Sequence, residues 1–102
     1  MTFSVAYRRA ASEDIDEALR WLGERSPAAA VDFLRAIARA ETHLRRTPLI
    51  YQVVRADIRR AHLKPFRHGL YFRVVEDRVL VIACLHASRS PAVIGNVLSE
   101  RR

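Results

Sequence analysis

The segment between residues 69 and 86 constrains the fold more than any other part of the chain. Residues 79–86 form a nearly continuous apolar run, and residues 69–75 are rich in aromatic and β-branched side chains. Glu76 and Asp77 lie between these runs and indicate a tight turn. A strand that is apolar along its whole length is typical of a central position, because both of its faces must be covered. We therefore expect an antiparallel hairpin whose second strand is buried on both faces.

Two helices are expected before this hairpin. Ser12 precedes two acidic residues, which is typical of a helix N-cap, and the first helix should end near Gly23. Ser26 and Pro27 should begin the second helix, and Pro48 should end it. The expected buried positions are Ile15, Ala18, Leu19 and Leu22 in the first helix, and Phe33, Leu34, Ile37, Ala38, Ala40 and Leu44 in the second. Because only a few residues separate the two helices, we expect a helical hairpin.

Three weaker segments complete the expected order. Residues 3–8 alternate between apolar and polar side chains as a half-buried strand does, and residues 58–63 indicate a further strand. Residues 91–102 form either a short C-terminal helix or a frayed end. A chain of 102 residues is expected to be one domain, spanning residues 1–102. The order β-α-α-β-β-β is typical of an α+β domain in which the helices pack on one face of a small antiparallel sheet.

Positive charge is concentrated in the second half of the chain. Residues 1–50 contain 8 arginines and 7 acidic residues, a net charge of +1. Residues 51–102 contain 9 arginines and 1 lysine against 4 acidic residues, a net charge of +6. This half contains the expected sheet, so the sheet should carry an arginine-rich face that suits a polyanion or an acidic protein partner.

Several classes of protein are disfavoured by missing motifs. The sequence has no phosphate-binding P-loop, no glycine-rich dinucleotide turn and no Cys/His pair at zinc spacing, so we expect neither a cofactor nor a metal. The single cysteine, Cys84, lies in an apolar run and is expected to be a buried, unreactive side chain. No segment is apolar for long enough to span a membrane, and no signal peptide is evident. We expect a cytoplasmic protein that does not bind membranes.

Basic residues on the expected strands are candidates for binding or for chemistry. A ribonuclease that uses no metal needs an acid, a base and cations that stabilise the charged transition state at phosphorus. His68 and His86 lie at paired ends of two expected strands, and the accompanying arginines are Arg59, Arg60, Arg73 and Arg89. Since side chains alternate along a strand, Arg59 and Arg60 cannot both face the same side.

Three aromatic residues have roles that the sequence leaves open. Tyr71 and Phe72 must point to opposite faces, so either Phe72 is core and Tyr71 is exposed, or the reverse. An exposed Tyr71 beside arginine suits stacking on a nucleobase. Trp21 lies off the main apolar stripe of the first helix and is expected to be partly buried where the helices or the sheet meet. An exposed Trp21 would instead mark a protein interface.

The strand segments together resemble a known family. They read IRR at residues 58–60, FRHGLYFRV at 66–74, VLVI at 79–82 and LHASR at 85–89. With the N-terminal strand, the long helical hairpin and Pro48, they resemble the RelE/ParE superfamily of bacterial toxins from type II toxin–antitoxin modules. The resemblance covers roughly residues 3–91. It implies the α+β fold described above and a cognate antitoxin as the partner.

Two branches of this superfamily imply different functions. RelE-like members cut mRNA in the ribosomal A site with basic residues on the sheet and, typically, a tyrosine or histidine near the C-terminus. On this branch His86 is the implied acid or base, and Arg59, Arg73 and Arg89 hold the phosphate. No tyrosine follows Tyr71, however, and lysine is almost absent. The length of the helical hairpin and the string from Arg67 to Arg73 look more ParE-like, and ParE-like members poison DNA gyrase by binding. We therefore favour the ParE-like branch.

The resemblance also implies how partners are bound. The antitoxin, ParD-like or similar, should supply an acidic amphipathic segment whose helix docks on the apolar strip of the helical hairpin, and the two proteins should form a hetero-oligomer. The expected partner-binding residues are Arg59, Arg60, Arg67, His68, Tyr71, Arg73, Arg89 and Trp21. Besides the gyrase inhibitor and the ribosome-dependent endoribonuclease, a third possibility is a non-toxic relic that still binds its antitoxin.

Overall fold

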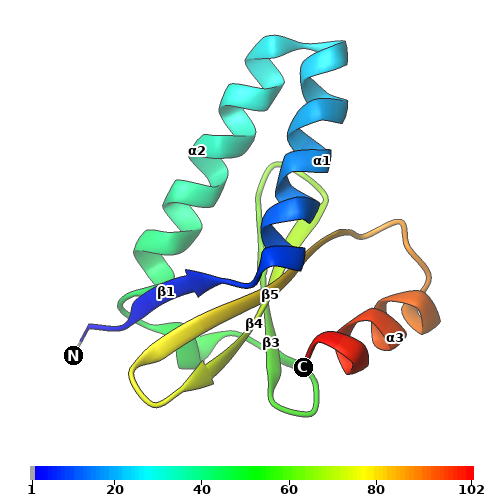
Figure 1. The fold of residues 1–102 in the computed structure, drawn as a ribbon. Helices are drawn as coiled ribbons and strands as arrows, with labels where there is room; N and C mark the ends of the chain where they lie inside the picture. Colours follow the sequence, from blue (N-terminus) through cyan, green and yellow to red (C-terminus); the bar gives the residue numbers. More distant parts are fainter. Residues whose placement is uncertain (1) are drawn as a thin grey trace.

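Helices cover both faces of a mixed sheet in the computed structural model, which describes residues 2–102 (Figure 1). The strands are β1 (Ser4–Tyr7), β2 (Val53–Arg55), β3 (Ile58–His62), β4 (His68–Val75) and β5 (Arg78–His86), in the spatial order β1-β5-β4-β3-β2. The helices are α1 (Arg9–Arg25), α2 (Pro27–Leu44) and α3 (Pro91–Arg101), with a 3-10 turn, η1 (Pro48–Ile50), after α2. The predicted α+β class, with its N-terminal helical hairpin, is confirmed.

The predicted β-hairpin is formed by β4 and β5. These strands pair antiparallel, from His68 opposite His86 to Val75 opposite Arg78. Glu76 in the connecting turn has a φ of 57°, in the left-handed region that tight turns use. Because β5 lies between β1 and β4, both of its faces are covered and most of its residues are buried, as the apolar run predicted.

A separate apolar core lies on each face of the sheet. On one face α1 and α2 pack over the strands, and the fully buried Phe33 and Phe72 belong to this core. On the other face Leu98 of α3 packs against a smaller cluster that comprises Ile58, Tyr71, Ile82, Ala83 and Leu85. Tyr71 and Phe72 point to opposite faces, as alternation requires, and both are buried because helices cover both faces. The alternative in which one of them is exposed is therefore wrong.

A β-bulge in β5 is held by a clamp between α1 and α3. Tyr71 pairs with Ala83 whereas Phe72 pairs with Val81, so Ile82 is the extra residue. The carboxylate of Asp14 in α1 accepts the backbone N–H of Cys84 at 3.0 Å and the guanidinium of Arg101 in α3 at 2.5 Å. Arg101 also donates to the carbonyl oxygen of Ile82 at 3.2 Å. These contacts satisfy backbone groups of β5 beyond Val81, the residue with which the pairing to β1 ends.

The helical hairpin differs from the prediction in two details. Ser12 does not cap the first helix: α1 begins at Arg9, and the N–H of Ser12 already donates to the carbonyl of Arg8 in the first turn. Leu34 of α2 is 51% exposed, and Ala38 is also exposed, although both were expected in the core. The buried face of α2 follows strict i, i+3, i+4 spacing and comprises Phe33, Ala36, Ile37, Ala40 and Leu44. The cap of α2 is as predicted, since the Ser26 Oγ accepts the N–H of Ala29.

The edges of the sheet also differ from the prediction. The N-terminal strand β1 pairs with β5 in parallel, with Val5 opposite Val79, so the sheet is mixed rather than wholly antiparallel. An additional strand, β2, forms the far edge; it is absent from the expected order of elements and has only three residues. The C-terminal segment is helical, and the Ser90 Oγ caps α3 by accepting the N–H of Val93.

Candidate functional site

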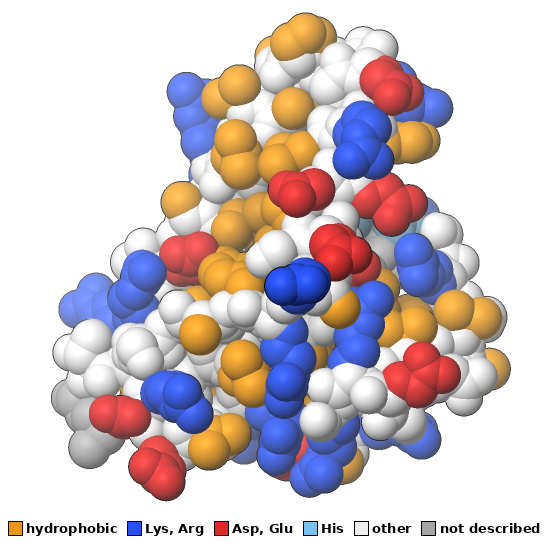
Figure 2. All heavy atoms as spheres, viewed as in Figure 1, with side chains coloured by type: hydrophobic (Ala, Val, Ile, Leu, Met, Phe, Trp, Pro, Cys, Tyr) orange, Lys and Arg blue, Asp and Glu red, His pale blue; other side chains and the backbone are white. Residues whose placement is uncertain are grey.

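The arginines of the sheet fall into two groups that differ in how their side chains are held. Figure 2 shows Lys and Arg side chains gathered over the sheet, whereas apolar side chains are exposed along the helical hairpin. Arg59 lies opposite Phe72 and therefore faces the helical hairpin. Its guanidinium donates to the carbonyl oxygens of Leu49 at 3.0 Å and Tyr51 at 2.7 Å. Arg59 thus holds the η1 segment against the sheet.

Arg73 belongs to the same structurally engaged group. It faces the α3 side and donates to Asp57 at 3.1 Å, while Arg102 donates to the other carboxylate oxygen of Asp57 at 2.8 Å. Desolvation acts to raise the pKa of Asp57, but the hydrogen bonds and charges of Arg102 and Arg73 outweigh it and lower this pKa below its ordinary value. Arg73 is therefore held in an ion pair within the fold, in which Arg102 shares the same carboxylate.

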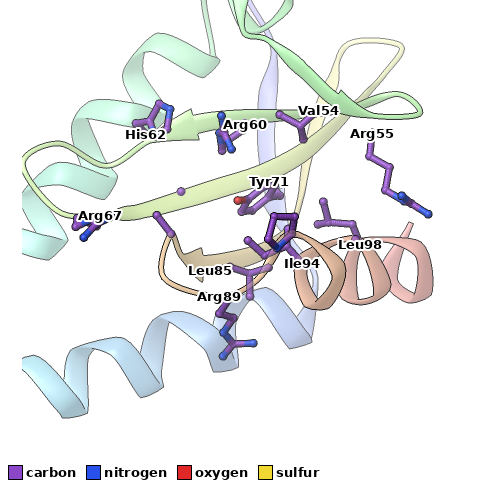
Figure 3. Close-up of a pocket in the computed structure, with 14 residues that line it drawn as sticks. Val54, Arg55, Arg60, His62, Arg67, Tyr71, Leu85, Arg89, Ile94 and Leu98 are labelled. Atoms are coloured by element: carbon purple, nitrogen blue, oxygen red, sulfur yellow. The ribbon is translucent and has the colours of Figure 1, made fainter.

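Arg60, Arg67 and Arg89, which were also expected to bind partners, are not engaged in this way. Among residues 2–102, no side-chain hydrogen bond or ion pair involves the guanidinium of Arg60, Arg67 or Arg89. All three line one cavity of about 360 Å³ between the sheet and α3, which we call the sheet cavity (Figure 3). Its floor and its α3 side are apolar and include Tyr71, Leu85, Ile94 and Leu98.

A second depression, the hairpin groove, lies between α1 and the connection from β3 to β4. Its volume is about 640 Å³, and its lining includes Trp21, Leu22, Phe66, His68 and His86. Arg67 and Arg89 line this groove as well as the sheet cavity. The two depressions therefore meet at this pair of arginines.

Trp21 is more exposed than predicted. Its side chain is 54% exposed on α1 and is stacked by the guanidinium of Arg25, which lies 3.7 Å from the ring centroid. An exposed tryptophan at the edge of an apolar groove is typical of a protein interface, because tryptophan is enriched at interface cores. The outcome follows the second of the two alternatives that the sequence left open.

His68 and His86 form a contact pair at the end of the hairpin. The two residues are register partners, and their rings meet edge to face with centroids 4.9 Å apart. The ring of His68 also meets Phe33 edge to face at 5.0 Å, and its Nδ1 is buried without a partner within residues 2–102. The Nδ1 of His86 lies 2.8 Å from the Ser88 Oγ and accepts the Ser88 N–H at 2.9 Å. The pair thus connects the helical hairpin to the loop that carries Arg89.

The four residues proposed for ribonuclease chemistry are not collected in one place. His86 faces the hairpin groove, whereas Arg73 lies on the opposite face, in an ion pair. Arg59 lies opposite Phe72, four positions along β4 from the partner of His86, which corresponds to about 13 Å at the usual rise of a strand. Only Arg89 is both unengaged and next to His86. The sheet therefore offers no constellation of these four side chains around a single phosphate.

Two residues of the sheet cavity were missed in the sequence. His62 lies on the same face of β3 as Arg60, two positions further on, and its exposed side chain lines the cavity. Arg55 of β2 also lines it, and its Nε donates to the Ser99 Oγ of α3 at 2.9 Å. Alternation of side chains along β3 would have identified His62 from Arg60. Arg55 lies in a three-residue strand, which is too short to show an alternating pattern in the sequence.

Within residues 2–102, no three His, Cys, Asp or Glu side chains are grouped closely enough to hold a metal ion. No helix in this described part is long and apolar enough to cross a membrane. Cys84 is buried as predicted, and its burial, with the nearby Asp14, raises the pKa of its thiol to about 12.

We expect the stability of the fold to fall in mild acid through His68. Desolvation, and secondarily the charge of His86, lower the pKa of His68, so the folded state favours the neutral ring. The unfolded chain takes up a proton below about pH 6.5, which the folded state resists, so the free energy of unfolding should decrease as the pH falls through that value. Urea unfolding between pH 8 and pH 5 should show a smaller decrease for His68→Phe, which keeps the ring on Phe33. An equal decrease in the variant and in wild type would contradict this origin.

Comparisons with known proteins agree with this geometry. Residues 5–91 match the family model described as ParE toxin of type II toxin-antitoxin system, parDE. The helical hairpin on an arginine-rich sheet is thus the fold of a toxin from a type II toxin–antitoxin system. The chain belongs to the ParE toxin family, which confirms the RelE/ParE resemblance and its ParE-like branch.

A solved structure supports the fold independently. The structure titled "Chromosomal ParDE TA system from P. aeruginosa" is similar to this chain with a TM-score of 0.72 and 16% sequence identity. The match covers 83% of this chain and 96% of the other. No curated protein sequence matches the chain. Helix α3 lies almost wholly beyond the residues that the family model matches, so the α3 side of the sheet cavity is not implied by family membership.

Proposed function

We propose that this protein is a cytoplasmic toxin that inhibits DNA gyrase by binding it and that a cognate antitoxin neutralises it. Membership of the ParE toxin family is the observation that carries this proposal. The arrangement of the sheet supports it, because Arg59 and Arg73 are engaged within the fold and stand apart from His86. A binding toxin needs no such catalytic constellation, whereas a metal-independent ribonuclease does.

Gyrase inhibition and mRNA cleavage can be separated in one experiment. Brief expression of the protein should abolish supercoiling and produce gyrase-linked DNA breaks, without codon-positioned cuts in ribosome-bound mRNA. The His86→Ala variant should retain this activity provided that it remains folded, as judged by circular dichroism. Rapid cuts at ribosomal A sites that disappear in His86→Ala would establish the ribonuclease alternative instead. A protein that has neither effect but still binds its antitoxin would be a non-toxic relic.

The antitoxin should dock in the hairpin groove. The lining of the groove includes both Trp21 on α1 and Arg89 after β5. Its apolar side, at Trp21, Leu22 and Phe66, suits the apolar face of such a segment, and Arg67 and Arg89 suit its acidic residues. Four of the expected partner-binding residues line this groove: Trp21, Arg67, His68 and Arg89.

Replacing Trp21 with alanine should weaken antitoxin binding by about 30-fold, since a buried interface tryptophan is typically a hot spot of about 2 kcal/mol. The antitoxin is the product of the neighbouring gene, and titration calorimetry gives its affinity. Val31→Ala is the matched control, because Val31 is an exposed apolar residue, 47% exposed on α2, that does not line the groove. Equal affinities for wild type and Trp21→Ala would place the antitoxin elsewhere on the toxin.

A further inference from the structure

The sheet cavity has a charge pattern that distinguishes it from the hairpin groove. Arg60, Arg67 and Arg89 line it with unengaged guanidinium groups, and His62 lies on the same side. No Asp or Glu of residues 2–102 contributes to its lining, whereas Asp14 and Glu17 line the hairpin groove. The positive charge here is therefore uncompensated, and an anionic ligand is the complementary occupant.

The shape of the cavity adds a second requirement. The free strand edge near it is short, since it comprises the outer edge of the three-residue β2 and the end of β3, where no β2 residue pairs. It therefore offers few backbone partners to an extended peptide. The accessible apolar surface of the cavity comes from Val54, Pro91 and Ile94, since Tyr71 and Leu85 are almost fully buried. A volume of about 360 Å³ is at the small end of ligand pockets and suits one flat ring system rather than a helix. The occupant should therefore combine a flat apolar body with strong negative charge.

The stem of Arg60 lies in close contact with a glycine. A Cβ atom added to Gly69 would lie 3.1 Å from the Cγ and 3.3 Å from the Cδ of Arg60, so a side chain there would require the arginine stem to shift slightly. Gly69 has no positive φ and lies in a regular strand, so its backbone does not require glycine. Glycine at this position therefore leaves room for the Arg60 stem beside the cavity.

We propose that the sheet cavity binds one nucleotide of a single-stranded nucleic acid. The base contacts the apolar surface of Val54, Pro91 and Ile94, and Arg60 and Arg67 contact its phosphate, because a guanidinium matches phosphate oxygens bidentately. Arg89 extends from the cavity toward α1 and contacts the neighbouring phosphate (Figure 3). A base must leave its stack to enter a concave site, which favours single strands over duplexes. This site does not depend on gyrase being the target of the toxin.

The position of the arginines has a consequence for regulation. Because Arg67 and Arg89 line both depressions, an acidic segment in the hairpin groove removes these two cations from the sheet cavity. Antitoxin binding should therefore compete with nucleic acid although Arg60 remains uncovered.

The test is a direct binding measurement with the full purified chain and no gyrase present. Fluorescence anisotropy with labelled 12-nucleotide oligothymidine and oligouridine measures affinity at several salt concentrations, and the stronger of the two identifies DNA or RNA as the source. Arg60→Gln and Arg67→Gln should each weaken binding by about tenfold and reduce the slope of log K against log salt by roughly 0.7 per lost phosphate contact. Arg46→Gln removes the same charge from an exposed residue outside the cavity and should change binding less than twofold.

Two further probes distinguish a built site from general attraction. Gly69→Ala keeps the net charge but displaces the Arg60 stem, so it should weaken binding severalfold while thermal unfolding reports that the fold is intact. An abasic 12-mer should bind at least fivefold more weakly than oligothymidine, because it lacks the base that contacts the apolar surface. A Glu-rich 12-residue peptide should bind more weakly still.

Three outcomes would overturn the proposal. Equal losses in Arg46→Gln and Arg60→Gln would reduce the site to general electrostatic attraction. Equal binding of the abasic strand and oligothymidine would show that no base occupies the cavity. Tighter, Arg60-dependent binding of the acidic peptide would assign the cavity to a protein partner. Since gyrase is absent from the assay, each of these results leaves the proposed gyrase inhibition to be judged by supercoiling alone.

Discussion

Replacing Phe33 with alanine is expected to destabilise the protein by about 3–5 kcal/mol, which is a large part of the stability of a domain of this size. Phe33 has no exposed surface, and its ring meets Phe66 edge to face at 5.1 Å and His68 at 5.0 Å. The truncation removes apolar contacts and leaves a cavity where α2 meets the end of the sheet, and a rigid core closes such a cavity only partly. Urea unfolding monitored by circular dichroism measures the loss.

The neighbouring residue provides the control. Leu34→Ala changes the same helix, but Leu34 is 51% exposed, so its free energy of unfolding should change by less than about 1 kcal/mol. Phe33→Leu should be intermediate, because it retains part of the buried area without the aromatic contacts. If Phe33→Ala cost no more than Leu34→Ala, the packing of α2 on the sheet would be wrong. Because Phe33 supports His68, which lines the hairpin groove, Phe33→Leu should also weaken antitoxin binding.

The sequence predicted the elements that have long and regular patterns. The apolar run of β5 identified an interior strand, and Ser26-Pro27 identified the start of α2. It did not predict that β1 joins β5 in parallel, since a periodic pattern identifies a strand but not its partner. The start of α1 was placed four residues late because Ser12 and the acids after it resemble a cap, whereas no side chain caps this helix.

The candidate site was predicted as a set of residues but not as an arrangement. Arg59, Arg60 and Arg73 look alike in the sequence, and what separates them is the partner that each one meets. Arg59 meets loop carbonyls and Arg73 meets Asp57, and both contacts depend on how a distant segment packs. The neighbours of Arg60 on β4 are Gly69 and Tyr71, and its guanidinium donates a hydrogen bond to neither of them. Alternation did predict correctly that Arg59 and Arg60 face opposite sides.

The clamp at the β-bulge supports a second large prediction: Asp14→Ala should destabilise the protein by about 2–4 kcal/mol. Asp14 accepts hydrogen bonds from the Cys84 N–H and from Arg101, and the side chains of Asp14 and Arg101 are only 13% and 24% exposed. Without the carboxylate, a backbone donor and a guanidinium are both left partly buried without their partner. Asp32→Ala is the matched control, since Asp32 pairs with Arg35 at 3.5 Å on an exposed helix surface, and it should cost well under about 1 kcal/mol.

A double-mutant cycle shows which part of the clamp carries this stability. If the main cost of Asp14→Ala is the unpaired guanidinium, then adding Arg101→Met should restore part of the lost stability, because methionine needs no partner. If the main cost is the Cys84 N–H at the bulge, Arg101→Met should restore nothing, and Asp14→Asn, whose side-chain oxygen still accepts that N–H, should be the milder variant. Since Arg101 also anchors α3 over Ile82, its replacement should loosen the α3 side of the sheet cavity, so single-strand binding should weaken in Arg101→Met even where the global stability is restored. A restored affinity together with restored stability would show that α3 is held by its apolar contacts at Leu98 alone.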